Sequence, residues 1–66
     1  MELRHIRYFL EIADTLSFSR AAERLRVGQP ALSRQIRDLE SELGGRLFHR
    51  TTVAVSLTEM GHYFRQ

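Results

Sequence analysis

The stretch Arg26–Leu32, RVGQPAL, interrupts a sequence of good helical composition and most limits how this chain can fold. Gly28 favours a turn at this point. Pro30 is tolerated in the first turn of a helix, because its missing N–H would have no helical partner there. The sequence therefore predicts that one helix ends before residues 26–28 and that another begins at Gln29.

Two helices are predicted before this break. Apolar residues three and four positions apart mark the first, over residues 2–13. Its expected buried face consists of Leu3, Ile6, Phe9, Leu10 and Ala13. Ser17 can cap a short second helix over residues 18–25, in which Ala21 and Ala22 allow a close helix crossing.

The helix after the break is predicted over residues 29–43. Its buried stripe is formed by Leu32, Ile36, Leu39 and Leu43, and Gly44 provides a left-handed stop. The opposite, open face carries Gln29, Ser33, Arg34 and Arg37. Helix, short turn and helix in this order indicate a helix-turn-helix over about residues 18–37.

Alternating residues then predict a short β-hairpin over about residues 46–57, with Val53, Val55 and Leu57 on one side and the bend at Thr51 and Thr52. Thr58 is expected to cap a last helix, in which Met60, Tyr63 and Phe64 are candidate packing residues. The predicted fold is mainly α: a winged helix-turn-helix with a three-helix core and a short β-hairpin wing, followed by the start of a linker helix.

Length and composition exclude several classes of protein. A chain of 66 residues forms at most one domain and buries only about 60% of its unfolded surface. It has no cysteine, which excludes a disulfide framework and a thiolate zinc site. We find neither a signal peptide nor a membrane span, and we expect a cytoplasmic protein without cofactor, metal or membrane partner.

Positive charge is concentrated in the middle of the chain. Residues 17–37 contain five arginines and one glutamate, a balance of +4, whereas residues 1–16 and 38–66 each carry −1. All ten cationic residues are arginine, which suits planar contacts with phosphate or guanine. Genomic composition bias also explains the arginines, and we prefer that explanation.

A helix-turn-helix places the N-terminal end of its second helix in the major groove of DNA. Candidate base-reading residues are Gln29, Pro30, Ser33 and Arg34, because amide, apolar, hydroxyl and guanidinium groups match adenine, the thymine methyl, either base type and guanine. Candidate DNA-backbone contacts are Ser17, Ser19, Arg20, Arg37, Arg50, Thr51 and Thr52. Arg24 and Arg37 have an alternative role as ion-pair partners of Glu23, Asp38 or Glu40.

The motifs SFSRAAERL, QPALSRQI and LESELGGRLFHR, together with SLTEMG, closely resemble the N-terminal DNA-binding domain of LysR-type transcriptional regulators. The resemblance covers nearly the whole chain. It implies a winged helix-turn-helix at residues 1–58 with recognition helix 29–43, and the first turns of a linker and dimerisation helix at residues 59–66. It also implies sequence-specific binding of double-stranded DNA at an interrupted palindromic operator.

The same resemblance implies a homo-oligomer, formed through the linker helix of the full-length protein, and a small-molecule effector bound by a C-terminal domain. At two positions the sequence departs from the family pattern. Gly28 stands where serine is frequent, and Val53 stands where the wing usually carries a basic residue.

Other functions were weighed against DNA binding. The three histidines, His5, His49 and His62, lack metal-ligand spacing and are interpreted as surface or wing residues. An enzyme is not expected, because so short a chain has little room for a pocket of about 300 Å³ or more. The alternative function is a winged-helix module for protein–protein interaction, using Tyr63 and Phe64, without specific DNA binding.

Overall fold

A computed structural model describes residues 1–51 and 53–66. The elements follow in the order α1 (Leu3–Thr15), α2 (Phe18–Leu25), α3 (Gln29–Leu43), β1 (Phe48–Arg50), β2 (Val55–Leu57) and α4 (Glu59–Arg65). The strands form an antiparallel pair with Phe48 opposite Leu57 and Arg50 opposite Val55. These elements confirm the mainly helical winged fold.

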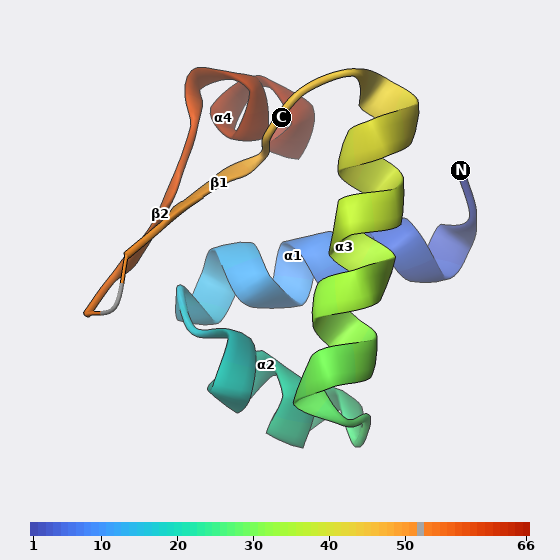
Figure 1. Ribbon diagram of the computed structural model, residues 1–66, viewed down its shortest axis with the longest axis vertical. Helices are drawn as coiled ribbons and strands as arrows, with labels where there is room; N and C mark the ends of the chain where they lie inside the picture. Colours follow the sequence, from blue (N-terminus) through green and yellow to red (C-terminus); the bar gives the residue numbers. More distant parts are fainter. Residues whose placement is uncertain (52) are drawn as a thin grey trace.

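Helices α1, α2 and α3 pack on one another, and the hairpin extends away from them (Figure 1). In this view α3 runs across α1, while α2 and α4 lie at opposite ends. α4 contacts β2. Figure 1 shows that the hairpin projects on the side of the molecule where α2 begins.

Three aromatic rings join the hairpin to the helices. The centroid of Phe48 in β1 lies 5.4 Å from that of Phe9 in α1 and 5.6 Å from that of Phe18 in α2. Around these rings the core is completed by Ile12, Ala13, Ala21, Ala22, Leu32, Ile36, Leu39 and Leu47. Burying such rings supplies a large part of the hydrophobic stabilisation of a chain this short.

The predicted buried face of α1 is partly wrong. Leu3, Ile6 and Leu10 are exposed, with 86%, 37% and 45% of their surface accessible. The buried face is rotated and consists of His5, Phe9, Ile12 and Ala13. Because both stripes satisfy helical spacing, only the positions of α2 and α3 decide which of them is covered.

His5 is buried, so its interpretation as a surface residue is wrong. Its Nδ1 accepts a hydrogen bond from the Glu2 N–H at 3.3 Å, so the Nε2–H can donate to Gln35 Oε1 at 2.8 Å. One partner on each ring nitrogen, Glu2 at the start of α1 and Gln35 on α3, satisfies a polar ring that would otherwise be costly to bury. Gln35 lies 30 residues away, beyond the reach of local sequence patterns.

The break between α2 and α3 lies where it was predicted, but the left-handed residue is Arg26, with φ 58°. Gly28 is the N-cap of α3 and has ordinary extended backbone, with φ −71° and ψ 141°. Pro30 lies in the first turn of α3, and Gly44 ends the helix with φ 80°. Glycine is therefore needed for its backbone freedom at Gly44 and not at Gly28.

The hairpin is shorter than predicted, because Val53 lies in its turn and is 91% exposed. Val53 consequently does not share the half-buried side of Val55 and Leu57. The hydroxyl of Thr51 accepts hydrogen bonds from the N–H groups of Val53 and Ala54, at 3.3 and 3.0 Å, and stabilises the turn. Thr52, predicted at the same bend, lies outside the described residues.

α4 packs against the body of the molecule. Thr58 caps it, as predicted, by accepting a hydrogen bond from the Gly61 N–H at 2.9 Å. Phe64 stacks edge-on against Phe9 with centroids 5.1 Å apart, and Met60 is half-buried against the core. Tyr63 is 80% exposed, so its prediction as a packing residue is wrong.

We predict that Gly28→Ser stabilises the fold by a few tenths of a kcal/mol, because serine is a better N-cap than glycine. The backbone angles allow a side chain, and an added Cβ meets only Pro30 Cδ at 3.9 Å. Gly44→Ser is the matched control and should cost about 1 kcal/mol or more through its positive φ. Urea unfolding measures both, and a destabilised Gly28→Ser variant would contradict the assignment.

Gly61→Ala should destabilise the chain by about 1–3 kcal/mol through overpacking. An added Cβ would approach the backbone oxygen of Leu47 at a distance no contact permits, and Leu57 Cδ2 at 2.9 Å. Gly45→Ala is a control, because its Cβ meets the flexible thioether of Met60, which can move. Equal urea midpoints for the two variants would show that α4 is not held against the Leu47 backbone.

Candidate nucleic-acid interface

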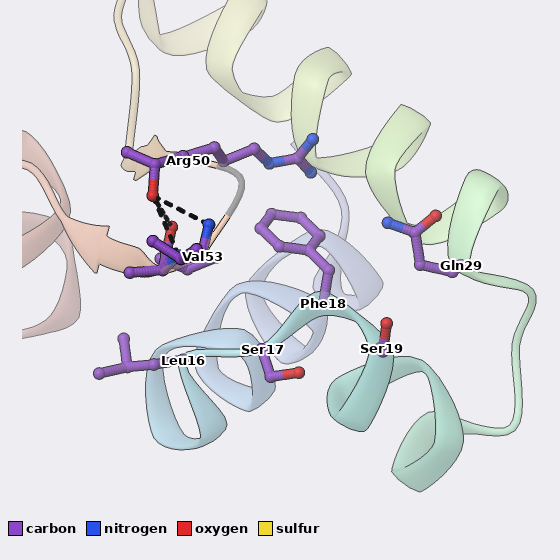
Figure 2. A pocket seen from close by; sticks show the side chains of 10 residues that line it. Leu16, Ser17, Phe18, Ser19, Gln29, Arg50 and Val53 are labelled. Carbon is purple, nitrogen blue, oxygen red and sulfur yellow. Dashed lines mark hydrogen bonds between the residues drawn. The ribbon is translucent and has the colours of Figure 1, made fainter.

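The start of α2, the start of α3 and the hairpin surround one open groove, with a volume of about 470 Å³, so the expectation that a chain this short has little room for a hollow of about 300 Å³ is wrong. Figure 2 shows Ser17 and Ser19 on one side of this groove, Gln29 on another and Arg50 and Val53 on the hairpin. Thr51 also lines it. The structure thus brings together five of the predicted contact residues from three separate elements.

The N-terminal end of α3 is open to solvent beside this groove. Gln29, Pro30 and Arg34 are exposed, as predicted. Gly28 gives α3 no side-chain cap, and the first N–H groups of a helix lack helical acceptors and carry a partial positive charge. This end of α3 can therefore accept an anionic or hydrogen-bond-accepting partner.

Ser33 is not on the open face, where it was predicted to lie, but is only 8% exposed. Its Oγ accepts a hydrogen bond from Gln29 Nε2 at 3.0 Å and another from Arg50 Nη2 at 3.1 Å. The hairpin covers this side chain because Arg50 reaches across to α3. The spacing of apolar and polar residues within α3 does not indicate that the hairpin covers Ser33.

Arg50 is held in place by its hydrogen bond to Ser33 and by its contact with the Phe18 ring. Its guanidinium carbon lies 3.6 Å from the centre of the Phe18 ring, a cation–π contact, and Figure 2 shows the end of the Arg50 side chain next to this ring. Burial lowers the pKa of Arg50, Glu40 opposes this, and the positive charges of Arg37 and Arg46 lower it further. Arginine remains charged at neutral pH after such a shift, because its ordinary pKa is far higher.

The residues predicted to contact the DNA backbone differ in their exposure and in their partners within the protein. Ser17 is half-buried and caps α2, because its Oγ accepts a hydrogen bond from the Arg20 N–H at 3.1 Å. Ser19, Arg20 and Arg37 are exposed. Within residues 1–51 and 53–66, no carboxylate lies within ion-pair distance of Arg20 or Arg37.

Arg24 is paired with carboxylates, though not with those considered from the sequence. Its Nη1 lies 3.0 Å from Glu11 and 3.0 Å from Asp14, both on α1. These hydrogen bonds, led by that of Glu11, raise the pKa of Arg24. Arg24 therefore ties α2 to α1 and is less available to a ligand than Arg20.

Phe18 and Glu40 are functional supports that sequence reasoning missed. Phe18 is the platform beneath Arg50, 32 positions further along the chain, so no local spacing could reveal the pair. The buried carboxylate of Glu40 accepts a hydrogen bond from the Leu47 N–H at 2.7 Å. It thereby fixes the point at which the chain leaves α3 for the hairpin.

Neither a metal-type cluster nor a membrane helix occurs in the described part of the chain. No three His, Asp or Glu side chains gather there closely enough to hold a metal ion. No helix there has the length and apolar character needed to cross a bilayer. His49 and His62 are exposed on β1 and α4.

Residues 3–62 match the family model described as the bacterial regulatory helix-turn-helix protein, lysR family. The chain belongs to this family. Because the match covers the groove, α3 and the hairpin together, membership rests on the whole arrangement and not on one motif.

Curated relatives of this lysR-family chain are longer proteins. It is 50% identical over 66 residues to the HTH-type transcriptional regulator BenM of Acinetobacter baylyi, matching 100% of this chain and 22% of BenM. It is 53% identical over 66 residues to the Hca operon transcriptional activator HcaR of Escherichia coli, again over 100% of this chain and 22% of the relative. The chain thus spans about a fifth of the length of these relatives.

Solved structures of the same fold include complexes with DNA. A complex of BenM_DBD with catB site 1 DNA superimposes with a TM-score of 0.95 at 50% identity, over 100% of this chain and 73% of that one. A CbnR_DBD–DNA complex also gives 0.95, at 40% identity, over 98% of this chain and 75% of that one. These matches show that the lysR-family fold described above is the winged helix of DNA-binding relatives.

Ser17→Ala should cost about 1 kcal/mol of stability, because it removes the N-cap hydrogen bond of α2. Ser19→Ala changes an exposed hydroxyl in the same groove and should stay within about 0.5 kcal/mol of the parent chain. Urea unfolding of both variants measures the difference. Similar losses, or none in either, would show that Ser17 does not support α2.

Proposed function

We propose that this lysR-family chain is the sequence-specific reader of double-stranded DNA in a bacterial transcriptional regulator, with α3 in the major groove. One observation carries the proposal: a TM-score of 0.95 at 50% identity to a chain solved on DNA. The exposed N-terminal end of α3, beside a groove with arginine at its edge, supports it. The role is one of binding and not of catalysis, and we place it in the cytoplasm, where bacterial DNA lies.

The contacts divide into base-reading and backbone-holding groups. We assign base reading to Gln29, Pro30 and Arg34, which are exposed at the open end of α3, and to Ser33, which lies beside them under the hairpin. We assign phosphate contacts to Ser17, Ser19, Arg20, Arg37, Arg50, Thr51 and Thr52. Arg34 of the base-reading group and Arg20 of the phosphate group are both exposed. Within the described ranges 1–51 and 53–66 neither has a carboxylate at ion-pair distance, so neither must break an ion pair to bind DNA.

We further propose that residues 1–58 form the reader and that residues 59–66 begin a linker helix through which full-length copies associate. Exposed Tyr63 on α4 and exposed Leu3 and Leu10 on α1 offer apolar surface for such association. Two associated readers would meet the half-sites of an interrupted palindrome. Any small-molecule effector would then act through another domain of the full-length regulator.

Selection of DNA from a pool of random duplexes by this chain, followed by sequencing, tests the function directly. Sequence-specific binding should enrich one motif and should weaken steeply with added salt. A protein-interaction module would enrich no motif, and its apolar contacts would hardly respond to salt. Recovery of random sequence at every salt concentration would overturn the proposal.

Arg34→Ala should cost about 1–3 kcal/mol on the preferred sequence and flatten the preference at one base pair, because guanine loses its bidentate partner. Arg20→Ala should weaken all sequences alike and reduce the salt slope by about one. Arg65→Ala, at the exposed end of α4, is the control and should change neither quantity. Equal losses on every sequence for Arg34→Ala, measured by fluorescence anisotropy, would exclude base reading by Arg34.

A further inference from the structure

Two side chains, one from α3 and one from the hairpin, converge on the hydroxyl of Ser33. Gln29 Nε2 reaches it from the preceding turn of α3, and Arg50 Nη2 reaches it from the hairpin. Phe18 of α2 supports the Arg50 guanidinium, whose carbon lies 3.6 Å from the ring centre. We call this chain of contacts, Phe18–Arg50–Ser33–Gln29, the groove relay; three of its members, Phe18, Arg50 and Gln29, appear together in Figure 2.

The relay limits what Ser33 can do. A serine hydroxyl has one hydrogen to donate and two acceptor sites. Both acceptor sites face protein donors here, at 3.0 and 3.1 Å. Ser33 can therefore serve a ligand only by donating its hydrogen.

The relay also orients Gln29. The amide nitrogen has two hydrogens, and Ser33 takes one of them. The second hydrogen and Oε1 remain at the open end of the side chain. These are the donor and the acceptor that adenine N7 and N6 require.

We propose that Arg50 is a positioning residue for base readout: from the wing, it holds Ser33 and thereby orders Gln29 before DNA arrives. This inference rests on the proposed DNA-binding function. It assigns to a wing arginine an effect on sequence preference at a base pair that Gln29 contacts. A role limited to phosphate would instead affect all sequences equally.

The physical basis is preorganisation. Ordering a long side chain at an interface costs about 0.5–1.5 kcal/mol, and an interaction made within the free protein removes that cost from binding. Only the sequence that uses the ordered conformation benefits. Breaking the relay should therefore reduce the preference at the Gln29 base pair by about two- to twelvefold, the same quantity converted to a ratio.

The first experiment is made without DNA, on the 66-residue chain. NMR relaxation of the Gln29 side-chain amide should show it ordered in the parent chain, and mobile, with an order parameter below about 0.6, in Ser33→Ala and Arg50→Ala. Arg37→Ala removes a neighbouring charge outside the relay and should leave Gln29 ordered. A Gln29 amide that is mobile in the parent chain, or unaffected by both relay variants, would overturn the proposal.

The second experiment repeats the random-duplex selection with the same variants. Gln29→Ala identifies the base pair concerned, and Ser33→Ala and Arg50→Ala should lose preference mainly there. Arg50→Lys keeps the charge but not the planar group that spans Phe18 and Ser33, so it should alter the preference and leave the salt slope unchanged. Arg37→Ala should weaken all sequences alike.

The outcomes separate the two proposals. If the parent chain selects no motif, the proposed function fails, and the readout role fails with it. If the parent chain selects a motif and the relay variants retain the same preference profile while losing affinity uniformly, only the positioning role is overturned. Should Arg50→Ala fail to fold, Ser33→Ala and Arg50→Lys decide the result.

Discussion

The packing of Phe48 between Phe9 and Phe18 is the contact on which the rest of this structure depends. It joins the hairpin to α1 and α2 with ring centroids 5.4 and 5.6 Å apart. A two-stranded hairpin is marginal by itself in water, so its position must come from this burial. Because Phe48 and Arg50 lie on the same short strand, burial of Phe48 also positions Arg50. Arg50 then contacts Ser33, which places the hairpin against α3.

That placement makes the candidate interface a joint product of three elements. Ser17 caps α2 and Ser19 lies within it, Gln29 and Arg34 belong to α3, and Arg50 lies at the end of β1. Each element is short, and none could hold its groups in position alone. The shared core therefore supplies the rigidity that a recognition surface needs.

Much of this arrangement could be predicted from local residues, and family resemblance added the order of the parts. The limits of α2 and α3, the caps Ser17 and Thr58 and the stop at Gly44 all depend on neighbours within one helical turn. Such signals are read from the chain directly, because caps and stops satisfy backbone groups nearby. The exposure of Gln29 and Arg34 followed from the buried stripe on the other side of α3.

The predictions that proved wrong share one physical cause. α1 has apolar residues on two faces, and α2 and α3 cover the one that contains Phe9 and Ile12, leaving Leu3 exposed. Tyr63 is as apolar in pattern as Phe64, yet only Phe64 meets Phe9. Helical spacing tells which residues share a face, but only the neighbouring elements decide which face is buried.

The sequence by itself determined the limits of α2 and α3, the turn between them, the basic middle segment and membership of the lysR family, since each is written in adjacent residues or in their order. Tertiary structure alone decided that Ser33 is covered, that Arg50 lies over Phe18 and that His5 is buried against Gln35. The residues that these contacts join are separated by between 17 and 32 positions in the sequence. Their partners are chosen by how the helices and the hairpin pack, which no local pattern of residues records.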